Sequence, residues 1–136
     1  MLFFRRDKKE AIMGIFIVML DSFTANTLKI ILHDGRPCFY SFKISKNYGC
    51  SCAFGDPSGH SSATILFYYY IYYSFIKKNP NIGKAAKNLA LIIWFLIFTN
   101  IGTSRVFYGK HFFMQVLLGW SLGLVNINIY RLIDKG

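Results

Sequence analysis

Four apolar segments dominate this chain of 136 residues and limit the folds open to it. Each is close to the roughly 20 residues that an α-helix needs to cross a bilayer. The segments are Ala11–Leu32, Pro57–Ile76, Ala85–Ile101 and Phe112–Ile133. A soluble bundle can also be rich in Phe, Tyr and Ile, but four consecutive segments of this kind favour lipid. We therefore predict an all-α, polytopic membrane bundle of about four transmembrane helices, forming one domain over residues 1–136. The tyrosine-rich run from Phe67 to Tyr73 is interpreted as lipid-facing or interfacial surface.

The charge balance points away from nucleic acid. Charged residues make up only 16% of the chain, yet the net charge is +10. No zinc knuckle, basic helix or RNA-binding sheet motif accompanies this excess. The cations are better explained by positions beside membrane spans and within the short motifs described below, so no nucleic-acid partner is expected.

The distribution of Lys and Arg between the loops predicts the orientation. One side holds Arg5, Arg6, Lys8, Lys9, Lys77, Lys78, Lys84, Lys87, Arg131 and Lys135, and the other holds Arg36, Lys43, Lys46, Arg105 and Lys110. By the positive-inside rule both termini are cytoplasmic, and the loops Asp34–Gly55 and Gly102–Lys110 face the lumen or the exterior. An endoplasmic reticulum or plasma membrane location fits this pattern.

The three cysteines lie in the first of these outer loops, where oxidation is possible. Cys38 can pair with either Cys50 or Cys52, which would leave one free thiol. A zinc site is less favoured, because no fourth ligand stands at a typical spacing.

The first polar motif is Lys29 followed by Arg36-Pro37. Seven residues are two helical turns, so both cations are expected on one face at the outer end of the first span, with Pro37 as the stop. Ser22, Asn26 and His33 fall on the same stripe, which is expected to point into the bundle. His33 and Asp34 themselves are interpreted as local, solvated residues. The alternative is a pair of cations that snorkel to the interface.

The second motif is Pro57-Ser58-Gly59-His60, preceded by Asp56. Asp56 suits an N-cap and Pro57 a first helical residue. The free backbone N–H groups of Ser58, Gly59 and His60 would then form an anion site at a helix start. A plain capped helix start is the alternative, but it leaves His60 unexplained.

The third motif is Ser104-Arg105, a turn at Gly109, and His111 at the opening of the fourth span. The planar fork of Arg105 can hold two phosphate oxygens at once. His111 is placed to act as a nucleophile through a neutral imidazole, although a lone interfacial histidine is more often structural.

The order and spacing of the motifs, K-x6-R-P, P-S-G-H and S-R-x5-H, resemble the type-2 phosphatidic acid phosphatase superfamily. The resemblance implies a six-helix fold of which this chain carries the last four. We expect either a fragment of a longer protein or a minimal version that needs a partner for the two other helices, with a second copy of the chain as one such partner. It also implies a metal-independent phosphatase that vanadate inhibits and that needs no cofactor. The phosphate ligands would be Lys29, Arg36, Ser58, Gly59 and Arg105, with His111 as nucleophile and His60 as general acid and base.

One position departs from the family pattern. An acidic residue normally follows the nucleophilic histidine by four positions and orients its ring, but here that position is Gln115. The pattern His-Phe-x-x-Gln-Val-x-x-Gly is similar to the glucose-6-phosphatase branch. The amide oxygen of Gln115 can still accept from the ring N–H, so we expect Gln115 to orient His111.

The motifs do not identify the group that carries the phosphate. A membrane-facing entrance makes a lipid phosphate the expected substrate, hydrolysed as a phosphate monoester through a phosphohistidine. A weak or inactive phospholipid-binding relative is the first alternative. A phosphatase for a sugar phosphate, such as glucose 6-phosphate, or for an isoprenyl pyrophosphate is the second. The vanadium haloperoxidases share the anion site, but they are soluble and larger.

Overall fold

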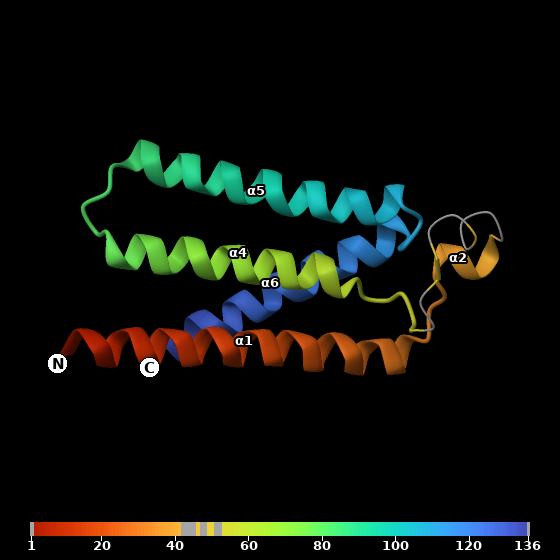
Figure 1. Cartoon of the computed structure of the whole chain (residues 1–136), viewed down its shortest axis with the longest axis horizontal. Coiled ribbons are helices and arrows are strands. Elements are labelled where there is room, and N and C mark those ends of the chain that lie inside the picture. The colour runs from red at the N-terminus through yellow and green to blue at the C-terminus, as the bar shows by residue number, and fades with distance from the viewer. Residues whose placement is uncertain (1, 42–45, 47–48, 51–52, 136) are drawn as a thin grey trace.

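The structure is a computed structural model, and it describes residues 2–41, 46, 49–50 and 53–135. The elements bounded within these residues are four long helices and the short helix α2, and this part of the chain contains no strand (Figure 1). The helices are α1 (Leu2–Leu32), α2 (Pro37–Tyr40), α4 (Gly59–Lys78), α5 (Lys84–Phe107) and α6 (Phe113–Lys135).

Helix α4 lies at the centre of the bundle and contacts α1, α5 and α6 (Figure 1). Helix α6 crosses α4 at an angle and also contacts the two flanking helices. A small apolar core forms where the four helices meet, from Ile17, Ile65, Leu66, Phe98, Ile127 and Tyr130. The central position of α4 fixes where its first turn lies relative to the ends of the other helices.

Two glycines on α6 allow it to pack closely against α4. A Cβ at Gly119 would lie 2.4 Å from the backbone oxygen of Ser58, and one at Gly123 would lie 2.9 Å from that of Ser62. Small residues spaced by four let helix backbones approach closely in membranes. This contact brings the start of α6 beside the start of α4.

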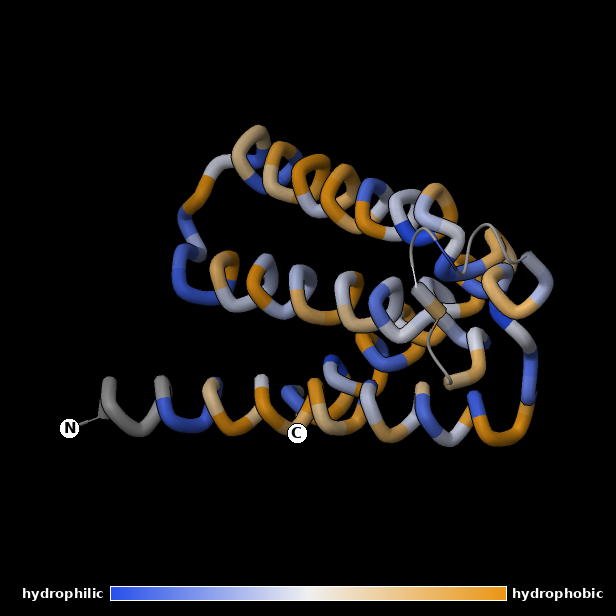
Figure 2. The backbone as a smooth tube through the Cα atoms, turned by 45° about the vertical axis from the view of Figure 1, so that its right-hand side comes forward, coloured by the Kyte–Doolittle hydropathy of each residue, from blue (hydrophilic) through white to orange (hydrophobic). Residues whose placement is uncertain are grey.

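Three helical segments are long and apolar enough to cross a membrane: Lys8–Tyr40, Lys84–Phe107 and Phe113–Asp134. The expected second span, α4, forms a helix of 20 residues but is not among them. Serines in its first turn, its tyrosines and two terminal lysines lower its mean hydropathy. Because α4 lies at the centre of the bundle, the other helices cover it. Helices α1 and α5 instead carry long hydrophobic stretches, coloured orange in Figure 2.

The tyrosine-rich run of α4 agrees with the sequence interpretation only in part, because Phe67 and Ile71 are exposed whereas three of its tyrosines are not free surface. Tyr69, Tyr70 and Tyr73 pack against the core. The Tyr70 hydroxyl also donates to the backbone oxygen of Glu10 at 2.6 Å. Aromatic side chains combine apolar area with a polar tip, so these tyrosines can join helices instead of facing lipid.

The end of α1 differs from the expected geometry. The helix ends at Leu32, and His33 adopts a positive φ of 50°. Arg36 therefore lies beyond the helix and does not share a helical face with Lys29. Pro37 is the first residue of α2, not a stop directly after α1. The expected disulfide is present between Cys38 and Cys50, while Cys52 lies outside the described residues.

The start of α4 also differs. The Asp56–Pro57 peptide bond is cis, and the helix begins at Gly59 with Ser58 as its N-cap. Asp56 and Pro57 therefore do not serve as cap and first residue. The predicted helix start was wrong by two residues, which changes the backbone groups that the helix end offers.

Candidate active site

The side chains of the three motifs converge at one end of the bundle. Lys29 stands in the last turn of α1, Arg36 directly precedes α2, and Arg105 stands in the last turn of α5. Gly59 and His60 open α4, and His111 lies between α5 and α6. These helix ends meet at the right of Figure 1. Four helices thus contribute to one site, as the motif order predicts.

Arg36 is held in the site by backbone oxygens. Its Nε donates to the carbonyl of Ala53 at 2.7 Å, Nη1 to that of Lys110 at 3.4 Å, and Nη2 to that of Phe54 at 3.4 Å. Only 7% of Arg36 is exposed. Neutral carbonyls orient the guanidinium without cancelling its charge, so Arg36 remains a buried positive charge.

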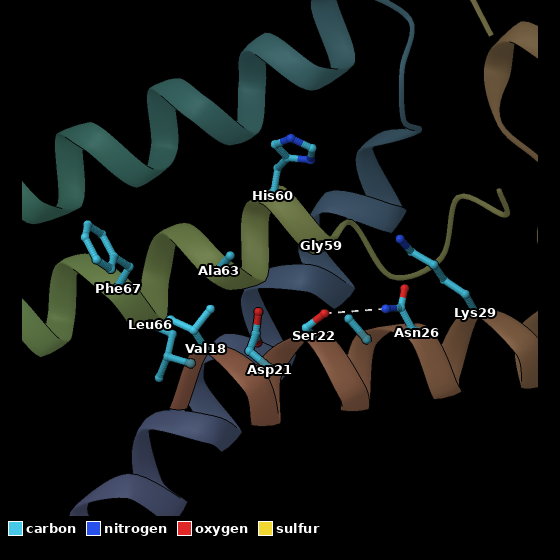
Figure 3. A pocket seen from close by; sticks show the side chains of 11 residues that line it. Val18, Asp21, Ser22, Asn26, Lys29, Gly59, His60, Ala63, Leu66 and Phe67 are labelled. Carbon is cyan, nitrogen blue, oxygen red and sulfur yellow. Dashed lines mark hydrogen bonds between the residues drawn. The ribbon is translucent and has the colours of Figure 1, made fainter. Parts of the chain in front are cut away.

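Lys29 extends from α1 toward the first turn of α4 (Figure 3). Its Nζ lies 3.7 Å from the position that a Cβ on Gly59 would occupy. The charges of Arg105, Lys29 and Arg36 all act on His60, which shows how close the cations lie to that ring. No carboxylate in the described part of the chain pairs with these three cations. Arg105 Nε is also buried without a hydrogen-bond partner.

His111 is placed by the turn that ends α5. The backbone N–H groups of Lys110 and His111 both donate to the carbonyl of Arg105, at 2.9 and 3.2 Å. Gly109 makes this turn possible with a φ of 62°, in the left-handed region that favours glycine. The turn explains the six-residue spacing between Arg105 and His111, because it folds the histidine back against the arginine.

Burial lowers the pKa of His111 to about 4, and the nearby charges of Arg36 and Arg105 act in the same direction. The residue is only 2% exposed. The imidazole is therefore neutral at pH 7 and keeps a lone pair for attack on an electrophile.

Ser58 is more constrained than the sequence indicates. Its backbone N–H donates to the carbonyl of Gln115 at 2.9 Å, and its hydroxyl accepts from Ser61 Oγ at 2.9 Å. The prediction of a free N–H at Ser58 was wrong, because the close packing of α6 supplies an acceptor. The backbone N–H groups of Gly59 and His60, the first residues of α4, have no acceptor among the described residues and stay available to a ligand.

Gln115 lies beside His111 but makes other hydrogen bonds. Its Oε1 accepts from the backbone N–H of Phe112 at 3.1 Å, and its Nε2 donates to Asp34 Oδ2 and to the Gly35 carbonyl, both at 2.8 Å. Both the Gln115 side chain and the Gly55 backbone still act to raise the pKa of His111 against burial, which places them next to the ring. The buried Nδ1 of His111 has no partner of normal hydrogen-bond geometry among the described residues.

Asp34 is the residue that sequence reasoning missed. It is solvent-exposed, as expected, but it binds Gln115 and so belongs to the site's surroundings. Asp56 is also nearby: burial and the charge of Asp34 raise its pKa. His33, by contrast, stays local and packs edge-on against Phe54. The only sequence signal for Asp34 was its proximity to Arg36.

A cavity of about 520 Å³ opens between α1 and α4, next to Lys29 and His60 (Figure 3). Its walls are polar near the site, with Ser22 and Asn26, and apolar farther along α1 and α4. The polar stripe predicted on α1 thus lines this cavity. His33 is not among the lining residues. Asp21 stands between the two parts and binds Asn126 at 2.9 Å.

No three His, Cys, Asp or Glu side chains in the described ranges come together in a way that could hold a metal ion.

Comparison with known proteins agrees with this geometry. The PAP2 superfamily model matches residues 11–135. Phosphatidylglycerophosphatase B of Bacillus subtilis (strain 168) is 32% identical over 134 residues, which are 98% of this chain and 63% of that protein. A crystal structure of a transmembrane PAP2-type phosphatidylglycerolphosphate phosphatase from Bacillus subtilis superposes with a TM-score of 0.80 at 28% identity. That match covers 98% of this chain and 63% of the solved one.

The chain thus spans less than two thirds of the length of these relatives. The three motifs, the helix ends that carry them and the match over nearly the whole chain agree with one another. The protein is an all-α integral membrane protein, and it belongs to the PAP2 superfamily.

Proposed function

We propose that this protein is a phosphatase that hydrolyses a lipid phosphate monoester through a phosphohistidine, without a metal ion. The observation that carries the proposal is the convergence of three cations, none paired with a described carboxylate, on two histidines at one end of the bundle. A phosphate dianion is the ligand whose charge and oxygen count suit such a site.

In the first step, His111 attacks phosphorus. Because its Nδ1 is buried, Nε2 is the nitrogen that forms the N–P bond. The bond between phosphorus and the leaving oxygen breaks, and His60 gives that oxygen a proton. Lys29, Arg36 and Arg105 stabilise the additional negative charge on the phosphoryl oxygens, while the N–H groups of Gly59 and His60 add hydrogen bonds.

In the second step, His60 takes a proton from a water molecule whose oxygen attacks the phosphohistidine. The new P–O bond forms as the N–P bond breaks, so inorganic phosphate leaves and neutral His111 is restored. The low pKa of His111 supports this cycle, because a ring that releases its proton readily is both an available nucleophile and a good leaving group.

The cavity beside the site supports a lipid as substrate. With the phosphate at Lys29, the rest of the molecule would follow the groove between α1 and α4 toward Val18, Leu66 and Phe67. Apolar walls at that depth suit a hydrocarbon chain. The curated relative and the solved structure, both from Bacillus subtilis, carry names for the same phosphatidylglycerophosphate phosphatase activity, which favours a glycerophospholipid.

The test is phosphate release by the purified protein in detergent with EDTA present. Phosphatidylglycerophosphate, phosphatidate, an isoprenyl pyrophosphate and glucose 6-phosphate are compared, and vanadate is added in parallel. We expect vanadate-sensitive release that is fastest with a glycerophospholipid. Binding of these lipids without any release would instead identify a non-catalytic relative, and release that EDTA abolishes would contradict the metal-free mechanism.

The positive-inside pattern further suggests that the site faces the exterior or a lumen. In a variant whose Cys52 is replaced by serine, a cysteine at Lys46 should react only with label added to that side. A cysteine at Lys84, the first residue of α5, should react only from the cytosol. The reverse labelling pattern would place the site in the cytoplasm.

A further inference from the structure

The side-chain amide of Gln115 is fully engaged at the start of α6. It is the third residue of that helix and 1% exposed. Its oxygen accepts from the Phe112 N–H, the return bond typical of a helix capping box. Its nitrogen uses both hydrogens, one on Asp34 and one on Gly35. A flipped amide would place donor against donor at Phe112 and oxygen against oxygen at Asp34, so the contacts determine the orientation.

This orientation directs the Gln115 oxygen toward His111. A carbonyl oxygen has two lone pairs, and the Phe112 N–H uses only one of them. The His111 ring lies beside the Gln115 side chain and the Gly55 backbone, and its buried Nδ1 has no partner of normal hydrogen-bond geometry in the described part of the chain. When His111 is phosphorylated the ring carries a positive charge, and the Nδ1–H then needs an acceptor at this position.

We propose that Asp34 is a positioning residue that acts on His111 through Gln115. The carboxylate accepts from Gln115 Nε2 at 2.8 Å and so polarises the amide, which makes its oxygen a stronger acceptor for the ring. The negative charge that Gln115 lacks is thus supplied by a residue 81 positions earlier in the chain. This inference rests on the proposed phosphatase function, since it gives Asp34 a part in stabilising the imidazolium.

The backbone around Asp34 is built to hold this contact. The positive φ at His33 turns the chain away from α1, and the Asp34 carbonyl accepts from the Gly55 N–H at 2.8 Å. A Cβ on Gly55 would lie 2.5 Å from both Gln115 Oε1 and Nε2. Gly55 therefore leaves room for the amide, and its own backbone lies beside the His111 ring.

A purely structural contact is the competing explanation, in which Asp34 only fastens its loop to α6. Asp34→Asn separates the two, because the asparagine oxygen can still accept from Gln115 Nε2 while the charge is removed. The matched control is Asp134→Asn, the same chemical change at the opposite end of the bundle.

The direct measurement is the His111 titration, followed by NMR of histidine-labelled protein with the His111→Ala variant for assignment. Arg36 and Arg105 depress this pKa, whereas the charges of Asp34 and of Asp56 beside it have the opposite sign. We expect Asp34→Asn to lower the pKa of His111 further by roughly 0.5. The shift is small because the Gln115 side chain separates the Asp34 charge from the ring. Asp134→Asn should leave the pKa of His111 unchanged. An equal shift in both variants, or none in Asp34→Asn, would overturn the proposal.

Turnover supplies the second readout. Asp34→Asn should reduce kcat about tenfold with little change in KM and in thermal stability, as for other outer-shell partners. Asp34→Asn combined with Gln115→Glu should recover most of the lost turnover. In this double variant the new asparagine amide can donate to one oxygen of the new glutamate, and the negative charge then lies next to His111. The bond to the Gly35 carbonyl is lost, so the recovery is measured against Gln115→Glu alone, which lacks the asparagine donor.

The two readouts also separate this inference from the proposed function. Wild-type protein that releases no phosphate but shows the NMR shift would refute the phosphatase and leave the action of Asp34 on His111 intact. An active enzyme in which Asp34→Asn changes neither the titration nor the turnover would refute the role of Asp34 alone.

Discussion

The two ends of this bundle differ in whether their charged side chains form ion pairs. At the site end, Lys29, Arg36 and Arg105 lie close to two histidines, and the partners of Arg36 among the described residues are backbone oxygens. At the opposite end, Lys77 pairs with Asp134 at 2.8 Å and Lys78 pairs with Glu10 at 3.2 Å. These two ion pairs join α4 to α6 and to α1. Tyr73 adds a hydrogen bond to Asp134 at 3.0 Å.

This difference separates charges that stabilise the fold from cations that, under the proposed function, bind the phosphate. A paired charge in a partly buried position offsets its own desolvation, so it can fasten helices. Cations that are brought together without carboxylates repel one another and cost stability. They are tolerated where a bound anion supplies the missing charge. Changing residues at each end separately therefore tests the comparison.

The largest effect is expected for His111→Ala. Loss of the attacking nitrogen removes the covalent step, and losing a nucleophile has cost about 10^6-fold in turnover in a serine protease. We expect phosphate release to fall at least about 10^4-fold, while the protein still inserts and purifies as a folded bundle. Release within about tenfold of the wild type would show that another group attacks phosphorus.

Arg105→Lys is expected to have the next largest effect. Lysine keeps the charge but cannot hold two phosphate oxygens in one plane, so kcat/KM should fall about 10^2-fold. The matched control is Lys77→Arg at the paired end, which should leave kcat/KM within about twofold. If neither exchange changes kcat/KM, the site cations act only through their charge, and the planar shape of the Arg105 guanidinium does not matter.

The lowered pKa of His111 should make the stability of the protein depend on pH. The His111 pKa of about 4 in the folded protein lies below the ordinary value of 6.5, so between these values the unfolded chain binds a proton that the folded chain does not. Stability should therefore fall as the pH falls from 6.5 to about 4, by up to about 3 kcal/mol from this residue. Thermal unfolding of wild type and His111→Gln over this range measures the difference.

Asp56 acts in the opposite direction, because its raised pKa favours the folded state as the pH falls. The difference between the two proteins, not either curve alone, is thus the relevant quantity. Parallel curves would mean that His111 titrates normally. Saturating phosphate should reduce the difference, since a bound dianion raises the pKa of the ring.

The smallest effect is expected at the paired end. Lys77→Met breaks a pair whose lysine is about one-third exposed, so we expect a loss of about 1 kcal/mol or less in stability. The melting temperature should fall by about 3 °C, and phosphate release should stay within about twofold. A large loss of activity here would show that the two ends are coupled and would break the comparison.

The local pattern of the sequence was enough to predict the helices and to predict that the motif residues meet at one end of the bundle. Hydropathy placed the four long helices near their observed positions, because a helix of apolar residues satisfies its backbone groups within itself. The motif order placed Lys29, His60, Arg105 and His111 at one end, because short loops between antiparallel helices bring their ends together. One of the two disulfide pairings left open, Cys38–Cys50, is the one present.

The contacts between these residues depended on the tertiary structure. Arg36 lies beyond α1 because the chain turns at His33, and the Ser58 N–H is occupied because Gly119 lets α6 approach α4 closely. The bond between Asp34 and Gln115 joins residues from opposite halves of the chain. Helix formation depends on neighbouring residues, which a sequence displays directly. Hydrogen-bond partners depend on where each helix ends and how closely helices pack, and a shift of two or three residues changes them.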